Sequence, residues 1–399
     1  MPQLTMEDRL LTITPEQRRL VIAHRHLLHG GATGPDEVAA TLIGLHATDP
    51  ATPFLSVLAR SRTTTIADIV DAMYARRSMV RWMAMRRTLF VFPTSEIAGI
   101  QAAVSTPLAA TLRRQLLSRL RRNGAEPPIE GDLDAWLADV EKQTMAALVD
   151  AGSATGAQLS ARVPGLTTVI LPGSPSEVRQ NVTSPLLTIM SANGLIVRGV
   201  PTGAWTSRNH LWQPAAAWWP HDFEATSEAD AQRALARRYL ERYGPATADD
   251  VQWWTGWNKT TTTRALSRLP TIDVDLHGRT GLMLGEPDLE IPDSPPHAAL
   301  LPSLDSTPMG WKEREWFLSI DRREIFDTAG NIGPTLWWNG EIIGSWAVAT
   351  TGEVRTSIRL DRGTDAKSTI HLAAAELQRR LDGTVVTPSI RTPLEKSLL

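Results

Sequence analysis

Apolar residues recur at helical spacing in three stretches of the chain, and each stretch is followed by short runs typical of strands. The third stretch is the clearest. It predicts helices over residues 227–243, 246–254 and 258–269, and strands over residues 271–275 and 280–284. Gly244-Pro245 ends the first helix, and Thr247 is a candidate N-cap for the second. This order of elements is typical of a winged helix-turn-helix unit.

Two earlier stretches predict the same order of elements. The middle copy has predicted helices at 132–151, 155–163 and 184–193 and a strand at 195–200. The first copy has predicted helices at 14–28, 35–45 and 65–75 and strands at 80–85 and 88–92, and a long basic helix at 95–122 follows it. Three such repeats predict tandem winged-helix units.

From residue 295 onward the pattern changes to short strands and turns, with Asn339-Gly340 as a strong hairpin signal and a last helix at 366–381. The predicted fold class is therefore α+β. Four domains are expected: winged helix 1 with the basic linking helix at 1–125, winged helix 2 at 126–222, winged helix 3 at 223–290, and a β-rich C-terminal domain at 291–399.

Composition narrows the class of protein. Hydrophobic residues make up 42% and charged residues 21%, which favours a globular rather than a disordered chain. There is no cysteine, which excludes disulfides, thiolate metal sites and cysteine nucleophiles. Neither a long apolar run nor a secretory leader is evident, so we expect a cytoplasmic protein without a membrane partner.

Two other ligand classes lack support in the sequence. His24, His26 and His29 have no carboxylate at matching ligand spacing, so no metal site is expected. The GxxxxGK[ST] pattern that cradles phosphates is absent, so no nucleotide cofactor is expected.

The net charge of -2 hides an uneven distribution along the chain. Residues 1–124 hold sixteen arginines, no lysine and nine acidic residues, a balance of +7 that leaves -9 for the remainder. Guanidinium groups suit bidentate contacts to phosphate, so the N-terminal part is expected to face nucleic acid. The alternative is a GC-rich genome that favours arginine codons throughout the chain.

Five segments taken together resemble one known family. They are LIGLHATDPATPFLSVLARS at 42–61, RWMAMRRTLFVFP at 81–93, RYLERYGPATADDVQWWTGW at 238–257, LLPSLDSTPMGWKER at 300–314 and GPTLWWNGEIIGSWAV at 333–348. In this order they resemble the bacterial winged-helix DNA glycosylases of the AlkZ and YcaQ kind. The resemblance implies three winged-helix units in a C-shape, a barrel-like C-terminal region, and duplex DNA on the concave side. It also implies a monofunctional, monomeric glycosylase that needs no metal or other cofactor.

The family's catalytic motif is altered here. Its glycosylases carry Gln, an apolar residue, then Gln or Asp after a Gly-Leu pair, whereas this chain has His46-Ala47-Thr48 after Gly44-Leu45. The resemblance implies that His46 and Thr48 grip the attacking water, and Asp49 is a candidate for the missing negative charge. An imidazole can also accept a proton near neutral pH. The alternative is that His46 packs against a helix end and that Asp49 is a turn residue before Pro50.

Several arginines are candidates for binding the DNA backbone. Alternation along a strand places Arg81 and the Arg86-Arg87 pair near one edge of the first wing, although a solvated face is the alternative. Arg208 lies in a tryptophan-rich loop at 205–219, beside Asn209 and His210. The full predicted set is Arg60, Arg76, Arg77, Arg81, Arg86, Arg87 and Arg208.

The predicted function is excision of bulky N7-alkylguanine adducts from double-stranded DNA, in repair or in self-resistance to a DNA-alkylating natural product. A large adduct does not fit a snug base-flipping pocket, which favours an open site. One alternative is a non-catalytic winged-helix DNA-binding protein, acting as a regulator or lesion shield. Another is a protein that sequesters the free genotoxin.

Overall fold

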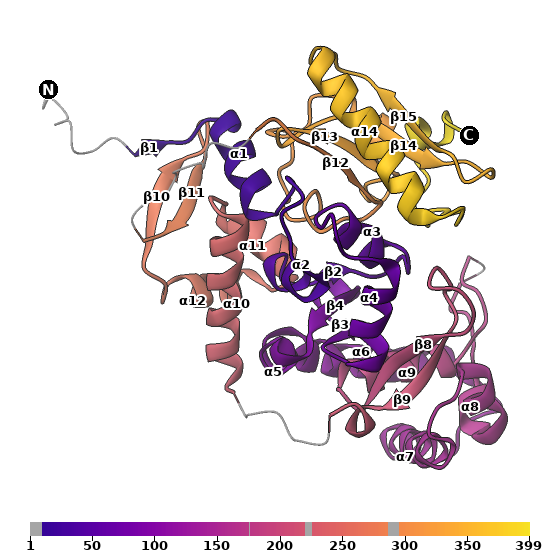
Figure 1. Ribbon diagram of the computed structural model, residues 1–399. Coiled ribbons are helices and arrows are strands. Elements are labelled where there is room, and N and C mark those ends of the chain that lie inside the picture. The colour runs from indigo at the N-terminus through magenta and orange to yellow at the C-terminus, as the bar shows by residue number, and fades with distance from the viewer. Residues whose placement is uncertain (1–9, 175, 220–225, 286–294) are drawn as a thin grey trace, which may run out of the picture. The chain divides into compact units, whose positions relative to one another are not determined.

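The computed structural model describes residues 10–174, 176–219, 226–285 and 295–399, which form a mixed α+β fold (Figure 1). The chain forms two compact units. Unit 1 comprises Met1–Ala72 and Arg233–Leu399, and unit 2 is the continuous segment Met73–Gln232. Within the described residues, no helix combines the length and apolar character needed to cross a membrane.

The N-terminal part of unit 1 consists of short helices. In chain order these are α1 (Pro15–Arg25), α2 (Pro35–Thr41), α3 (Thr52–Leu58) and α4 (Ile66–Val70), with the short strand β2 (Leu45–His46) between α2 and α3. Thr14 and Gln17 form a capping box at α1, as Thr65 and Asp68 do at α4. The sequence predicts a helix through residue 45, but α2 ends at Thr41, and α3 was not predicted.

The helices and strands of the third predicted copy are present, and all of them lie in unit 1 except the first turn of α10, which precedes Arg233. They are α10 (Glu228–Tyr243), α11 (Ala248–Thr255), α12 (Lys259–Leu266), β10 (Thr271–Asp275) and β11 (Thr280–Leu284). Thr247 caps α11, and the side chain of Asn258 caps α12. β10 and β11 are antiparallel, and β1 (Leu11–Thr12) adds to β10 in parallel.

The C-terminal part of unit 1 is an antiparallel sheet with the order β12-β13-β14-β15. Its strands are β12 (Ala298–Leu301), β13 (Thr335–Trp338), β14 (Glu341–Val348) and β15 (Val354–Ile358). Asn339 and Gly340 both have positive φ and join β13 to β14, as the sequence predicts. α14 (Thr364–Leu381) lies across β12 and β15. Two short helices, α13 (Arg322–Ile325) and α15 (Pro393–Lys396), also belong to this part. The sheet is open within the described residues, so the expected barrel-like region is not confirmed.

Unit 2 begins with the hairpin of β3 (Met79–Met83) and β4 (Leu89–Pro93), joined through a 3₁₀ turn at Met85–Arg87. The predicted helix at 95–122 is interrupted, because α5 (Ile97–Ile100) passes through a π turn at Gln101–Ser105 before α6 (Thr106–Asn123) starts. Pro107 lies in the first turn of α6, where its missing N–H leaves no helical hydrogen bond unmade.

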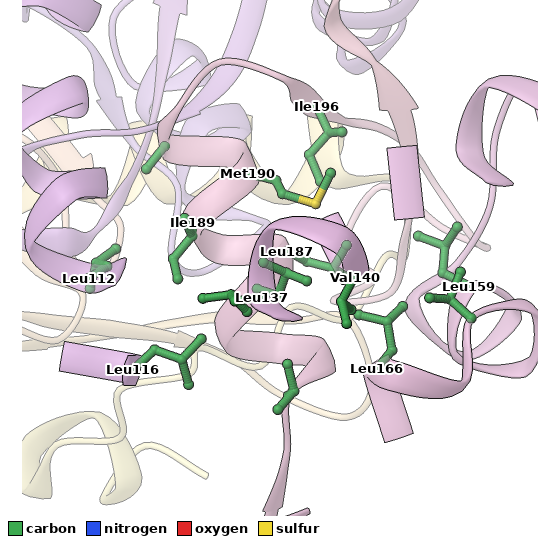
Figure 2. Close-up of a cluster of buried hydrophobic side chains, with 14 of the residues drawn as sticks. Leu112, Leu116, Leu137, Val140, Leu159, Leu166, Leu187, Ile189, Met190 and Ile196 are labelled. Atoms are coloured by element: carbon green, nitrogen blue, oxygen red, sulfur yellow. The ribbon is translucent and has the colours of Figure 1, made fainter. Parts of the chain in front are cut away.

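The remainder of unit 2 packs around one hydrophobic core. Leucines of α6 meet apolar side chains of α7 (Leu133–Ala151), α8 (Gly156–Arg162) and α9 (Thr183–Ala192) in this core (Figure 2). β5 (Ala125–Glu126), β6 (Val169–Ile170) and β7 (Gln180–Asn181) form a small sheet. β8 (Ile196–Pro201) pairs with β9 (His210–Pro214), so part of the expected loop at 205–219 is a strand.

The sequence predicts four domains, whereas the structure divides into two compact units. The helices of the first predicted copy belong to unit 1, whereas its strands belong to unit 2. The predicted boundaries at 222–223 and 290–291 lie outside the described residues. The four domains, the three winged-helix units and their C-shaped arrangement therefore stay predictions.

Candidate active site and DNA-binding arginines

The His46–Thr48 motif follows a tightly capped helix end. At the C-terminus of α2, Gly44 N donates to Ala39 O (2.8 Å) and Ile43 N donates to Ala40 O (3.3 Å), which is the Schellman arrangement. Ile43 has φ 50° and Gly44 has φ 94°. A left-handed conformation is strained for a β-branched residue, and such strain is frequent at functional sites. The reversed backbone leads directly into β2 and His46.

Ser306 holds this turn from the other side. Its hydroxyl accepts a hydrogen bond from His46 N (3.0 Å) and donates to Gly44 O (2.9 Å). Ser306 and His46 are 3% exposed each, whereas Thr48 is exposed. The backbone of the motif is thus fixed by a buried serine that is 260 residues distant in the sequence.

The carboxylate of Asp49 is buried and accepts hydrogen bonds from two backbone N–H groups. Its Oδ1 accepts from Ala51 N (3.0 Å) and its Oδ2 accepts from Ser389 N (2.6 Å), and the side chain is buried. The first bond is an Asx turn that leads into α3, and the second ties the C-terminal segment to it. A small apolar cavity that Asp49 also lines has a volume of about 10 Å³, room for at most one water. The turn interpretation of Asp49 fits this geometry better than a role as a catalytic base.

Arg60 is a buried structural residue, which corrects the expectation that it binds DNA. It is 0% exposed, and its guanidinium group pairs bidentately with Asp305 at 2.7 and 2.9 Å. Its remaining hydrogen bonds go to His26 O, Ser56 O and Thr307 Oγ1. All five N–H donors are therefore engaged inside unit 1, and none is left for a phosphate.

The Arg60–Asp305 pair anchors the segment that carries Ser306. Asp305 also accepts from Ser56 Oγ (2.6 Å) and from Thr307 N (2.9 Å). Burial alone would raise the pKa of Asp305, but the charge of Arg60 and these hydrogen bonds lower it instead. The carboxylate therefore remains ionised, and the ion pair fixes Ser306 beside it.

His26 completes this network as a neutral side chain. Burial, followed by the charge of Arg60, lowers its pKa to about 3. Nε2 lies 3.1 Å from Arg242 O and so donates to it, while Nδ1 accepts from the Thr307 hydroxyl at 2.8 Å.

Among the described residues no cluster of three His, Asp or Glu side chains is placed to hold a metal ion.

The other predicted arginines lie in unit 2 and differ in exposure. Arg76, Arg87 and Arg208 are exposed, and Arg86 is half-buried. Arg77 is half-buried as well: its guanidinium donates to Ala217 O (2.5 Å) and lies 5.2 Å from the ring of Trp218. Arg81 is only 5% exposed. Three of these side chains, Arg76, Arg87 and Arg208, are therefore exposed to solvent on unit 2.

Arg87 also lines a polar pocket of about 180 Å³ together with Arg119 of α6. Ser184 and Thr188 of α9 contribute hydroxyl groups to the same pocket. α9 corresponds to the last predicted helix of the middle winged-helix copy, and basic and hydroxyl groups are typical ligands of phosphate oxygens. Arg119 was not among the predicted DNA contacts.

Sequence reasoning missed the buried anchors of the motif. Asp305, Ser306 and Thr307 occur in the segment LLPSLDSTPMGWKER, which carried part of the family resemblance, but no local pattern assigned them a role. Their polar side chains follow apolar residues in the sequence, which could have indicated buried polar groups that need hydrogen-bond partners.

Comparison with known proteins agrees with the fold. The model of the AlkZ-like DNA glycosylases matches residues 39–382. Among solved structures, the chain is similar to the Streptomyces sahachiroi DNA glycosylase AlkZ, with a TM-score of 0.71 and 18% sequence identity over 94% of this chain and 99% of that chain. No curated protein matches. Because the family model spans most of the sequence, this chain belongs to the AlkZ-like family of DNA glycosylases.

Proposed function

We propose that this enzyme hydrolyses the N-glycosidic bond of bulky N7-alkylguanine adducts in duplex DNA, in repair or in self-resistance to a DNA-alkylating natural product. The observation that carries the proposal is the His46–Thr48 segment, which Ser306 holds at the end of a strained turn. A polar segment fixed in this way is suited to positioning a small reactant rather than to packing.

The chemistry of the substrate requires little of the protein. Guanine alkylated at N7 is already cationic, so its glycosidic bond breaks readily through an oxocarbenium-like sugar. The enzyme must place a water below C1′, accept its proton and stabilise positive charge. In our proposal His46 accepts the proton, Thr48 orients the water, and Asp49 acts as a positioning residue through the turn before α3.

DNA is held in this proposal by the arginines of unit 2. The exposed side chains Arg76, Arg87 and Arg208 make direct phosphate contacts, and Arg77 and Arg86 support them from half-buried positions. We further propose that the enzyme works as a monomer on three tandem winged-helix units. The cavity beside Asp49 is far too small for a purine, which agrees with an adduct recognised from an open surface.

Base release from defined duplexes tests the substrate class. The substrates are matched oligonucleotides that carry N7-methylguanine, a bulky N7-alkylguanine or unmodified guanine at one position. We expect the free modified base and an abasic site from the bulky adduct, with no release from unmodified DNA. Tight binding of all three duplexes with no base released from any would instead select the non-catalytic DNA-binding alternative.

A further inference from the structure

Two buried arginines of unit 2 lie on neighbouring strands. Arg81 is on β3 and Arg198 is on β8, which packs beside β3, and they are 5% and 8% exposed. Arg198 pairs with Trp212 in the β8–β9 register, and its guanidinium lies 4.4 Å from that ring. Among the described residues, its guanidinium donates one hydrogen bond, to Ser191 Oγ at 3.3 Å. The cation therefore lies against the ring, and the described residues accept hydrogen bonds from few of its five donors.

The positive charge of this pair is not balanced by any described residue. Within the described part of the chain neither guanidinium is paired with a carboxylate, and Arg81 Nε is buried without a hydrogen-bond partner. Burial, and then the charge of Arg81, lower the pKa of Arg198 to about 9. Two unpaired buried cations destabilise a fold, and proteins ordinarily compensate them with an opposite charge.

His210 is a half-buried residue close to this pair. It stands next to the exposed Arg208 and Asn209, and its ring is 4.8 Å from that of Trp212. Its Nδ1 lies 3.3 Å from Arg208 O, while Nε2 is buried without a partner in the described structure. Burial and the charge of Arg198 lower its pKa to about 4, which keeps the ring neutral near pH 7.

We propose that Arg81 and Arg198, with His210 at the entrance, form a binding site for a phosphate oxyanion, and that the DNA backbone supplies this phosphate. Planar guanidinium groups match the geometry of phosphate oxygens. An oxyanion would neutralise the charge of the pair and favour a protonated His210, whose Nε2–H then has an acceptor. The identity of the DNA source rests on the proposed function, because it assumes a duplex substrate.

The test uses the full-length protein and substitutions that retain the aliphatic stem of each arginine. Arg81→Met, Arg198→Met and the double variant are compared with Arg162→Met, an exposed arginine of unit 2 already paired with Asp150 at 3.2 Å. Thermal unfolding is followed with inorganic phosphate against chloride at equal ionic strength. Binding of unmodified duplex DNA is measured at several salt concentrations.

We expect phosphate to raise the unfolding temperature of the wild type and of Arg162→Met, and not that of the double variant. Each single substitution at the site should reduce the slope of log affinity against log salt by about 1. A phosphate effect with an unchanged DNA slope overturns the DNA backbone as the source and assigns the site to a free phosphate compound. Equal behaviour of all proteins in both measurements overturns the site.

A purely structural role has a different signature. It predicts that Arg198→Met lowers the unfolding temperature equally in phosphate and in chloride, through lost packing on Trp212. Neither the unfolding measurement nor the DNA-binding measurement depends on base release, so both test the phosphate site independently of catalysis. An enzyme that binds duplex through Arg81 and Arg198 but releases no bulky adduct would contradict the proposed function alone.

Discussion

Ser306 is the residue on which the geometry of the motif depends most directly. One hydroxyl group satisfies both His46 N and Gly44 O, and it is adjacent to the carboxylate that neutralises Arg60. A buried ion pair is weak support for stability by itself, but it fixes a unique arrangement of the groups around it. Here that arrangement sets the backbone of His46.

Replacing this hydroxyl should affect catalysis more than DNA binding. Ser306→Ala leaves a buried N–H and a buried carbonyl without a partner, which costs about 1–3 kcal/mol of unfolding free energy. We expect a base-release rate at least tenfold below that of the wild type, with unchanged duplex affinity. Single-turnover kinetics and a binding titration measure the two effects separately.

Ser345→Ala is the matched control for this prediction. Ser345 is also buried in unit 1, and its hydroxyl donates to Pro334 O (2.6 Å) rather than to the backbone of the motif. Its loss should reduce stability to a similar degree and leave base release intact. Equal loss of activity in both variants would show that stability, rather than the position of His46, sets the rate.

At the scale of elements, the end of α2 determines where the motif lies. The Schellman turn places Ile43 and Gly44 in the left-handed region, and the chain then leaves in the direction of β2. A side chain at Gly44 would strain a backbone with φ 94°. The motif is therefore coupled to a backbone conformation rather than to side-chain packing alone.

Gly44→Ala should destabilise the protein by about 1 kcal/mol or more and slow base release, because alanine is strained at positive φ. Gly99→Ala is the comparison, since Gly99 lies in α5 with open space around its Cα. That change should be neutral or stabilising, because alanine favours a helix by up to about 1 kcal/mol. Chemical unfolding of both variants gives the comparison, and a fully stable, fully active Gly44→Ala protein would contradict it.

The sequence predicted elements well where they are amphipathic and capped. The helices and strands of the third copy were predicted to within about three residues, because Gly244-Pro245, Thr247 and Asn258 mark helix ends. α3 was missed because all seven of its residues are buried, so it has no polar face to reveal a helical period. Strand β9 was missed because its tryptophan-rich surroundings were interpreted as a loop.

The candidate site was predictable only in part. The family motif located His46 and Thr48, but local sequence did not distinguish Arg60 from the other arginines. Its partners come from His26, Ser56, Asp305 and Thr307, which are up to 247 residues distant. A contact of that range follows from the packing of unit 1 and has no signature in the neighbouring residues.

At the scale of the whole molecule, buried neutral histidines make the fold sensitive to acid. His26 in unit 1 has a pKa of about 3 and His210 in unit 2 has one of about 4, whereas an unfolded histidine titrates near ~6.5. Between these values the unfolded chain binds more protons than the folded chain. Stability should therefore fall as the pH decreases from about 6.5 toward these folded pKa values.

His26→Gln should weaken this dependence in unit 1, because it removes one group that must be protonated on unfolding. Urea unfolding at a series of pH values measures the slope, and His371→Gln, a change at an exposed position of α14, is the control. Identical pH dependence in the wild type and His26→Gln would show that His26 is not buried in the neutral form.

The central claim is that His46 takes part in removing a bulky N7-alkylguanine. The most direct measurement is the single-turnover rate of base release from a duplex with one such adduct, for the wild type and His46→Ala at saturating protein. We expect release by the wild type and a rate lower by a factor on the order of 10² or more in the variant, because general acid–base catalysis contributes about 10²–10⁴. Equal rates in the two proteins would contradict the role of His46, and no release by the wild type would contradict the proposed substrate.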